Sequence, residues 1–182
     1  MDARSRRSQE ALRSAVLTLA ERMPIGDVTA SAVCSEAGIT RDTFYRHTES
    51  PTALLADALA EEIAEAMEVL PRTEAIGDGE RALISHVHRR SGVYRGAMHP
   101  LLAAPLRSAL ERSIREGLVL WAQLHPRIVP PEFADPAAMR IAVAYAAAGT
   151  VGAIEEWLRG DDDDIDRAVR LILAASPEWW LH

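Results

Sequence analysis

The chain has 182 residues, roughly the length of one to one and a half ordinary domains, which is enough to bury a core without disulfides or metals. Its composition is 48% hydrophobic, 5% aromatic and 26% charged, which excludes a disordered chain, a collagen-like repeat and a disulfide scaffold. The single cysteine, Cys34, favours a reducing compartment, and the longest uncharged run, 141–154, is too short for a membrane span. No apolar leader is visible, so we expect a cytoplasmic protein that does not enter a membrane.

Charge is divided unevenly along the sequence. Residues 1–50 carry seven Arg against seven acids, whereas the remaining residues carry 13 Arg against 20 acids and hold the whole formal net charge of −7. A neutral N-terminal segment can approach a polyanion that would repel the acidic remainder. Arg4, Arg6 and Arg7 are therefore candidates for a flexible basic arm, and a disordered tip without contacts is the alternative.

Apolar residues at three- and four-residue steps predict a row of helices in the first part of the chain. The first predicted helix covers 8–22. Two short helices follow, one over 29–38, with a threonine cap and a closing glycine, and one over 40–47. A serine followed by a proline then starts a fourth helix of about five turns, over 51–70.

The same spacing continues in the second part of the chain. It predicts helices over 80–94 and 105–125, a long helix over 136–159 that begins behind an Asp-Pro pair, and a last helix over 165–175. Neither strand alternation nor an internal repeat is visible. The sequence therefore predicts an all-α fold.

Residues 29–47 have the length, the caps and the glycine turn of a helix-turn-helix, whose second helix enters the major groove of DNA. Helical hairpins with glycine turns are also common packing units, so these features alone leave both interpretations open. The second helix, TRDTFYRH at 40–47, favours DNA binding, because Phe44 is its one clear core residue and the other side chains are too polar for a buried helix.

Residues 8–59 resemble the N-terminal domain of the TetR/AcrR family of transcriptional repressors. The resemblance rests on Val28-Thr29, Glu36-Ala37-Gly38-Ile39, Thr43-Phe44-Tyr45-Arg46-His47 and Leu54-Leu55. The stretch GTVGAIEEWLRG at 149–160 is similar to the penultimate helix of many members. The resemblance implies a DNA-binding domain at 1–50 and a helical effector-binding and dimerisation domain at 51–182. It also implies a homodimeric regulator, most often a repressor, that a small molecule releases from its operator.

By this resemblance, the helix over 40–47 reads base edges. Arg41 can donate two hydrogen bonds to guanine and Asp42 can accept one from cytosine. The hydroxyl of Thr40 both caps the helix and contacts the DNA. Thr43, Tyr45 and His47 match phosphate-binding positions of the family, and Thr29, at the start of the helix over 29–38, can place its hydroxyl and the adjacent N–H groups on a phosphate. Arg46 either touches a phosphate or is solvated, and both interpretations stay open.

Two residues depart from the family pattern. Thr48 stands where an aromatic residue is usual, and Pro51 stands where a lysine usually anchors a phosphate. The loss of one cation per half-site weakens non-specific attraction and flattens the salt dependence. The alternative function is therefore a helical ligand-binding or scaffolding protein whose N-terminal module no longer binds DNA.

The predicted helix over 136–159 carries little side-chain bulk, which indicates close packing against another helix. In the resembled family the last two helices form a four-helix bundle with those of a second copy, and a hairpin buried within one chain is the alternative. The candidate interface residues are Gly149, Gly152, Ala153, Ile165, Val169 and Ile172. A dimer would place two recognition helices about one DNA turn apart on a pseudo-palindromic operator.

The middle helices are expected to enclose an effector pocket. Its candidate residues combine apolar surface with a few polar groups, and they are Met67, His86, Tyr94, Met98, Trp121 and Tyr145. Each of them could equally be a plain core residue. The mixture favours a small, mostly apolar or aromatic ligand, and no cofactor can be inferred.

Other polar groups do not form a metal or catalytic pattern. His86 and His88 lie on different sides of a helix, so they cannot share one metal as an i, i+4 pair could. The acidic run at 161–164, with Asp166, lacks the glycine and the distal glutamate of an EF-hand, and helix capping is the better interpretation. No nucleophile elbow or phosphate loop occurs, so we expect neither an enzyme nor a metal site.

Overall fold

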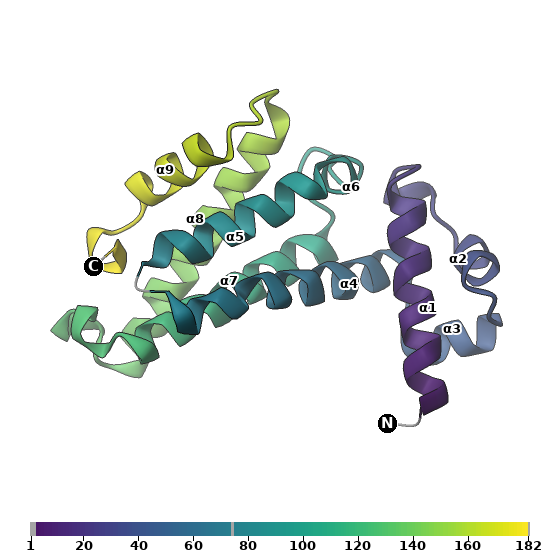
Figure 1. Cartoon of the computed structure of the whole chain (residues 1–182), viewed down its shortest axis with the longest axis horizontal. Helices are drawn as coiled ribbons and strands as arrows, with labels where there is room; N and C mark the ends of the chain where they lie inside the picture. Colours follow the sequence, from purple (N-terminus) through teal and green to yellow (C-terminus); the bar gives the residue numbers. More distant parts are fainter. Residues whose placement is uncertain (1–2, 74, 182) are drawn as a thin grey trace. The chain divides into compact units, whose positions relative to one another are not determined.

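The computed structural model describes residues 3–73 and 75–181, with side chains from residue 5 onward. Its regular elements are all helical, which confirms the predicted all-α class (Figure 1). The α-helices are α1 (Ala3–Ala20), α2 (Ala30–Ala37), α3 (Arg41–His47), α4 (Pro51–Ala66), α5 (Ile76–Arg89), α6 (Ser91–Arg95), α7 (Ala104–Leu124), α8 (Pro136–Arg159) and α9 (Ile165–Ala175). Short 3₁₀ helices are η1 (Ile25–Asp27), η2 (Met67–Arg72), η3 (Pro126–Ile128), η4 (Pro131–Phe133) and η5 (Glu178–Leu181).

Helix α1 starts before its predicted N-terminus. It begins at Ala3 rather than at residue 8, because the preceding residues include good helix formers and contain neither glycine nor proline. Arg6 and Arg7 therefore stand on exposed turns of a helix, and the expected flexible arm is wrong for them. Arg4 shares the helical backbone, but its side chain lies outside the described ones.

The fourth predicted helix is shorter than expected. Helix α4 ends at Ala66, and the chain continues as the 3₁₀ helix η2, which contains Pro71. The proline has no N–H to donate, and its ring would clash with the carbonyl of Met67, four residues earlier. The regular α-helical hydrogen bonding therefore stops one turn before the proline.

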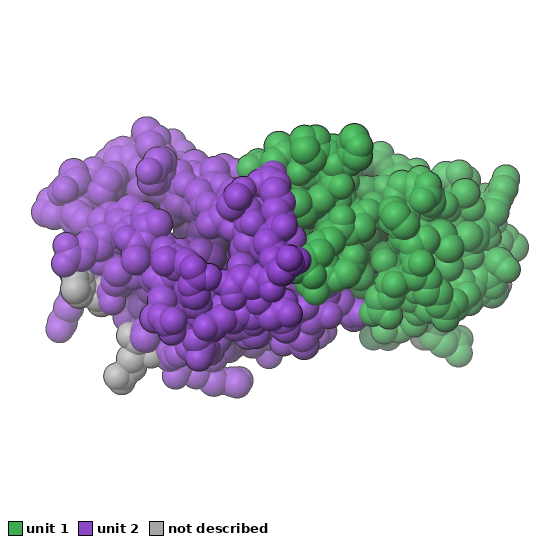
Figure 2. Space-filling model, turned by 90° about the horizontal axis from the view of Figure 1, so that it is seen from above, with its two compact units in different colours: residues 1–61, 91–109 green, residues 62–90, 110–182 purple. Residues whose placement is uncertain are grey.

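The chain forms two compact units, which Figure 2 shows in different colours. The first contains Met1–Glu61 and Ser91–Ala109, and the second contains Glu62–Arg90 and Leu110–His182. The units do not coincide with the expected functional division between residues 50 and 51, which stays a prediction. The helix-turn-helix segment lies entirely within the first unit.

In the first unit, α1 packs against both α2 and α3. The contacts bury Leu12 and Val16 of α1, Val33 of α2 and Phe44 of α3, each with no exposed surface. Cys34 is also buried, as expected for a small residue in this core. Because Phe44 is the one fully buried residue of α3, this core holds the short helix in place and leaves its polar side chains toward solvent.

In the second unit, α9 lies beside α5 and α8 (Figure 1). A core cluster joins Leu70 of η2, Trp121 and Ala122 of α7, Val143 of α8 and Trp180 of η5. Asp164 caps α9 by accepting a hydrogen bond of 2.9 Å from the Arg167 backbone N–H. This cap agrees with the capping role predicted for the acidic run.

Among the described residues, α8 is the one helix long and apolar enough to cross a membrane. Its apolar stretch extends beyond the uncharged run at 141–154, so the length of that run did not reveal it. Only 28% of that stretch is buried within the chain. Interface helices of soluble proteins have the same composition, so one such helix does not by itself indicate a membrane span.

Candidate functional site

The turn between α2 and α3 depends on Gly38. This residue has φ 66° and ψ 33°, in the left-handed region that glycine adopts without a steric penalty. The following backbone N–H, of Ile39, donates a hydrogen bond of 3.0 Å to the Cys34 carbonyl, which closes α2. The chain can therefore begin α3 only a few residues after α2 ends.

Threonine caps fix the N-termini of both helices. Thr29 Oγ1 accepts a hydrogen bond of 3.2 Å from the Ala32 N–H, and Thr40 Oγ1 accepts one of 3.3 Å from the Thr43 N–H. The Thr29 hydroxyl still has a proton and a second lone pair, whereas the Thr40 hydroxyl also lies 3.1 Å from Thr43 Oγ1 and shares a hydrogen bond with it. Thr29 and Thr40 are exposed, so each can cap its helix and also contact a ligand oxygen.

The outer face of α3 is polar and accessible. Arg41, Asp42, Tyr45 and Arg46 are exposed, whereas Thr43 and His47 are half-buried. The Tyr45 ring is 61% exposed and meets the buried Phe44 ring edge-on, with centroids 5.1 Å apart. The phenol group is therefore held against the helix by packing while its hydroxyl faces solvent.

Two arginines of α3 already have partners. Arg41 donates a hydrogen bond to the Ser31 hydroxyl on α2. Arg46 lies 3.3 Å from the Asp42 carboxylate and donates to Thr43 Oγ1 at 3.0 Å. Exposed pairs of this kind contribute only about 0.3–0.5 kcal/mol, so a nucleic acid can displace them at low cost.

The two residues that depart from the family pattern shape the connection between α3 and α4. Thr48 follows α3, and its hydroxyl donates a hydrogen bond of 3.1 Å to the Ser50 carbonyl. Ser50 Oγ accepts one of 3.1 Å from the Ala53 N–H, and Pro51 is the first residue of α4. The start of α4 therefore offers polar groups to a phosphate but no lysine.

The structure does not bring the six predicted pocket residues together. Met67 and Trp121 line one cavity of the second unit. His86 is buried beside Glu62, whereas Tyr94 and Met98 belong to the first unit. Tyr145 is 73% exposed on α8 and lines a different pocket, with Gly149 and Ile172, rather than this cavity.

The cavity shared by Met67 and Trp121 is small, about 30 Å³. Its wall is mainly apolar and consists of Met67, Leu70, Ile76, Gly79, Glu80, Leu83, Ile114, Gly117, Leu118 and Trp121. Two polar atoms on this wall, Oε1 of Glu80 and Nε1 of Trp121, are shielded from solvent and have no hydrogen-bond partner among the described residues. Burial raises the pKa of Glu80 to about 7.

Glu80 was not among the predicted site residues, although the sequence contains a signal for it. Helix α5 buries Gly79, Leu83, Ile84 and Val87, which lie on one side of the helix at three- and four-residue steps. Glu80 occupies a position on that same side. An acid within an apolar stripe is costly to bury, so its position could have been recognised as a candidate site.

His86 was expected to line the effector pocket, but in the structure it lies beside the charged side chains of Glu62 and Arg90. Its Nδ1 lies 3.6 Å from Glu62 Oε2, and Arg90 donates hydrogen bonds of 3.0 and 2.5 Å to the same carboxylate. Burial lowers the pKa of His86 to about 4, against the opposing effect of Glu62. The imidazole is therefore neutral at neutral pH and belongs to this buried polar cluster.

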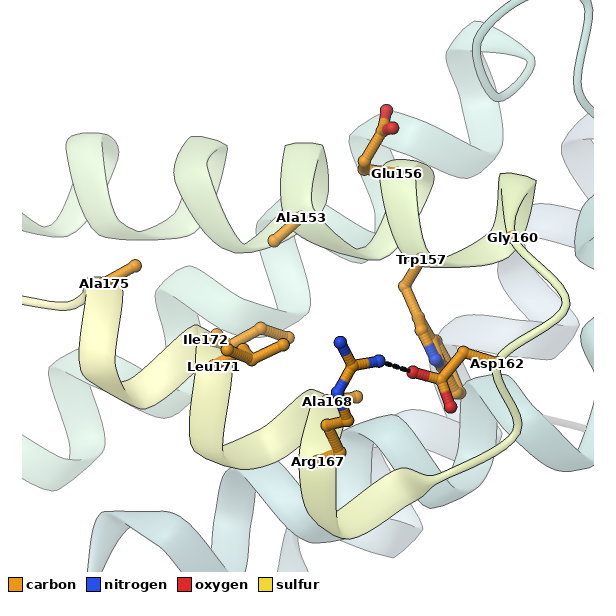
Figure 3. Close-up of a pocket in the computed structure, with 10 residues that line it drawn as sticks. All are labelled: Ala153, Glu156, Trp157, Gly160, Asp162, Arg167, Ala168, Leu171, Ile172 and Ala175. Atoms are coloured by element: carbon orange, nitrogen blue, oxygen red, sulfur yellow. Dashed lines mark hydrogen bonds and ion pairs between the residues drawn. The ribbon is translucent and has the colours of Figure 1, made fainter.

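A larger groove lies between α8 and α9 (Figure 3). It has a volume of about 360 Å³ and is mainly apolar, with Ala153 and Trp157 on α8 and Leu171 and Ala175 on α9. Arg167 reaches across one end and bonds to the Asp162 carboxylate, as Figure 3 shows.

The predicted interface residues fall into two groups. Gly149 is exposed on α8, and Gly152 and Ala153 are partly exposed. On α9, Val169 and Ile172 are buried within the chain and Ile165 is half-buried. The two helices also expose three large apolar side chains that were not among the predicted interface residues, namely Ile141, Tyr145 and Leu171, at 70%, 73% and 58% exposure.

These observations define an all-α chain with an exposed, capped helix-turn-helix in one unit and an apolar helix pair in the other. No protein-family model and no curated protein matches the sequence. Solved structures do match the fold. One is "Dihydroxyacetone kinase operon activator DhaS", with a TM-score of 0.63, 16% identity, and coverage of 92% of this chain and 95% of that chain.

Two further structures show the same likeness. A TetR transcriptional regulator from Rhodococcus sp. RHA1 has a TM-score of 0.62 and 20% identity, with 92% of this chain and 96% of that chain covered. The SmeT–triclosan complex has a TM-score of 0.51 and 17% identity, with 92% and 90% covered. The chain therefore has the fold of TetR-family transcriptional regulators, as its sequence motifs predicted.

Proposed function

We propose that the chain is a ligand-responsive transcriptional regulator that binds DNA as a homodimer. The observation that carries this proposal is the solvent-facing polar surface of α3, which Phe44 anchors and the Thr40 cap and the Gly38 turn position. A short helix held in this way can enter the major groove without losing its shape. The fold likeness to transcriptional regulators supports the same interpretation.

In this proposal, α3 supplies sequence recognition. Arg41 and Asp42 contact base edges, and Thr40 adds a hydroxyl at the helix start. Phosphates are held by residues that lie around this face, namely Thr29, Thr43, Tyr45, Arg46 and His47. Arg6 and Arg7, on exposed turns of α1, add positive charge to the same unit.

A second copy of the chain is the proposed partner of the α8–α9 face. The exposed side chains of Ile141, Tyr145 and Leu171 provide apolar area. Gly149 and Gly152 have no side chain to hold a second helix away, and no atom of this chain lies within 4 Å of a Cβ built on either, so the space beside them is open. A twofold arrangement repeats these contacts on both copies. Dimerisation would give the regulator two recognition helices for a pseudo-palindromic operator.

We further propose that a small, mostly apolar effector selects a conformation with lower operator affinity, so that the regulator acts as a repressor. The similar SmeT structure is a complex with triclosan, which supports an effector site in this fold. DhaS is an operon activator, so the sign of regulation needs its own measurement. A chain with this function would act in the cytoplasm, where its DNA lies.

The experiment is a salt titration of binding to the DNA upstream of the chain's own gene, with shuffled DNA of the same length as control. The proposal predicts a preference for the upstream DNA and a linear fall of log K with log salt concentration. Equal binding to both DNAs, or no binding to either at low salt, contradicts it.

The absence of binding to either DNA at low salt favours the alternative, a helical ligand-binding or scaffolding protein whose N-terminal module no longer binds DNA. The observation behind this alternative is the local structure at Thr48 and Pro51, which supplies no cation at the start of α4. Substituting Pro51 by Lys separates the two cases. A regulator gains affinity for all DNA and about one unit of salt slope, whereas a module that has lost the interface gains neither.

A further inference from the structure

Glu80 is a half-buried acid with one carboxylate oxygen shielded from solvent, and neither the proposed DNA interface nor the α8–α9 face uses it. It lies on α5, in the second unit, and its Oε1 has no solvent and no hydrogen-bond partner among the described residues. An ionised carboxylate in such a place costs several kcal/mol unless a counter-charge reaches it. The acid is therefore satisfied only when it holds a proton or meets a cation.

The cavity beside Glu80 is built from helices that approach closely. A Cβ on Gly79 would lie 2.5 Å from Cδ2 of Leu70, and a Cβ on Gly117 would lie 3.2 Å from Cε of Met67. The two glycines thus let Leu70 and Met67, both on η2, pack down onto α5 and α7. These two side chains therefore lie beside the glycines, on the wall of the cavity that Glu80 and Trp121 also line.

The space that remains, about 30 Å³, has room for a group of the size of one or two water molecules. An ammonium group fits, but an organic body fits only if Met67 and Leu70 move. Methionine is the side chain best suited to such a movement, because it is unbranched and has three rotatable bonds. The ligand body would take the place of the Met67 thioether on an apolar wall.

We propose that this cavity binds a small organic ammonium ion, with its nitrogen against Glu80 and its apolar body in the space that Met67 vacates. Its acceptor atom, where the ligand has one, receives the hydrogen bond of Trp121 Nε1. A neutral ligand of the same shape can satisfy one of these polar atoms but brings no counter-charge to the carboxylate. The binding of an ammonium ion in this cavity does not depend on the proposed function. Only the further statement that the cavity is the effector site rests on it.

The test is calorimetric titration of the full chain at pH 7 with 2-phenylethylamine and with its neutral analogue 2-phenylethanol. We expect the amine to bind at least about tenfold more tightly than the alcohol, as a charge-assisted hydrogen bond requires. Glu80→Gln should remove this preference. It should lower the affinity for the amine and change the affinity for the alcohol by no more than about threefold. Glu116→Gln removes the same charge from an exposed position on α7 and should leave both affinities unchanged.

A second variant tests the place of binding without a change of charge. Gly117→Val inserts a branched side chain where Met67 packs, so it should abolish binding of both probes. Circular dichroism confirms that each variant is folded. Any of three results overturns the proposal. The wild-type chain binds amine and alcohol equally, the preference for the amine persists in Glu80→Gln, or neither probe binds to the wild-type chain.

The result can be separated from that of the proposed function. Amine binding without any DNA binding leaves the cavity assignment standing and contradicts the regulator. Specific DNA binding without amine binding contradicts the cavity assignment alone. If both are present, titrating the amine into the operator complex measures whether the cavity controls DNA affinity.

Discussion

On α3, the Arg46 guanidinium lies 3.3 Å from the Asp42 carboxylate, one helical turn before it. The pair shields a negative charge on the surface that we propose to meet DNA. Both side chains are well exposed, so the bond is weak and can exchange for a base or a phosphate. We therefore expect two roles for Arg46: it pairs with Asp42 in the free protein, and it contacts a phosphate in the proposed DNA complex.

Arg46→Ala should accordingly weaken binding to all DNA sequences to a similar extent, by about 1 kcal/mol, because it leaves Asp42 uncompensated near the phosphates. Fluorescence anisotropy with upstream and shuffled DNA measures the loss. In the double variant Arg46→Ala, Asp42→Asn, affinity for shuffled DNA should partly return. A double variant as weak as the single one would show that repulsion by Asp42 is not the cause.

Arg41→Ala should lower affinity for the specific DNA by about 1–3 kcal/mol and relax the preference at one base pair. The physical reason is the loss of two hydrogen bonds to a purine edge, which shuffled DNA does not offer in register. Tyr45→Phe is the matched control, because it removes one phosphate contact and should weaken all sequences alike. Equal losses on specific and shuffled DNA for Arg41→Ala would refute its base-reading role.

Gly152→Ala should have opposite effects on folding and on assembly. No atom lies within 4 Å of a Cβ at this position, so the added methyl stabilises the helix of an isolated chain by about 1 kcal/mol. In a dimer that packs closely on α8, the same methyl pushes the helices apart. Chemical denaturation below the dimer dissociation constant and analytical ultracentrifugation separate the two effects.

Gly92→Ala on α6 is the control for that experiment, since its Cβ also meets nothing within 4 Å and it lies in the other unit. It should leave the association constant unchanged. If Gly152→Ala also leaves it unchanged, the dimer does not use this part of α8.

The helix-turn-helix could be predicted from sequence because its determinants are local. The Thr40 cap, the Gly38 turn and the single core residue Phe44 each act within a few residues of their position, and the structure has all three. The end of α4 was misplaced because the effect of Pro71 reaches back one turn, to Met67.

The orientation of α8 could not be predicted in the same way. The helix is apolar on most of its circumference, so its periodicity does not indicate which side faces the core. Tyr145 was therefore placed with residues of the middle helices, whereas it lines a pocket with residues of α8 and α9, and Ile141 was not singled out. The position of Glu80 within the apolar stripe of α5 could be seen in the sequence, but the cavity could not, because part of its wall comes from α7, more than 30 residues further along the chain.

Two buried groups with oppositely shifted pKa values predict how stability depends on pH. The folded chain raises the pKa of Glu80 from 4.5 to about 7 by burial, so between these values the unfolded chain has released the proton that the folded chain still holds. The stabilisation by protonated Glu80 is thus complete below pH 4.5 and is lost as the pH rises to 7. Burial lowers the pKa of His86 from 6.5 to about 4, so its contribution is lost as the pH falls from 6.5 to 4.

The two contributions oppose each other over the same pH range, so wild-type stability should change little between pH 4.5 and 6.5. Glu80→Gln removes one of them. The free energy of unfolding of this variant, minus that of the wild type, should rise by up to about 3 kcal/mol between pH 4.5 and pH 8. Urea denaturation at four pH values measures the difference, and a value independent of pH would mean that Glu80 is ionised in the folded chain and has found a partner.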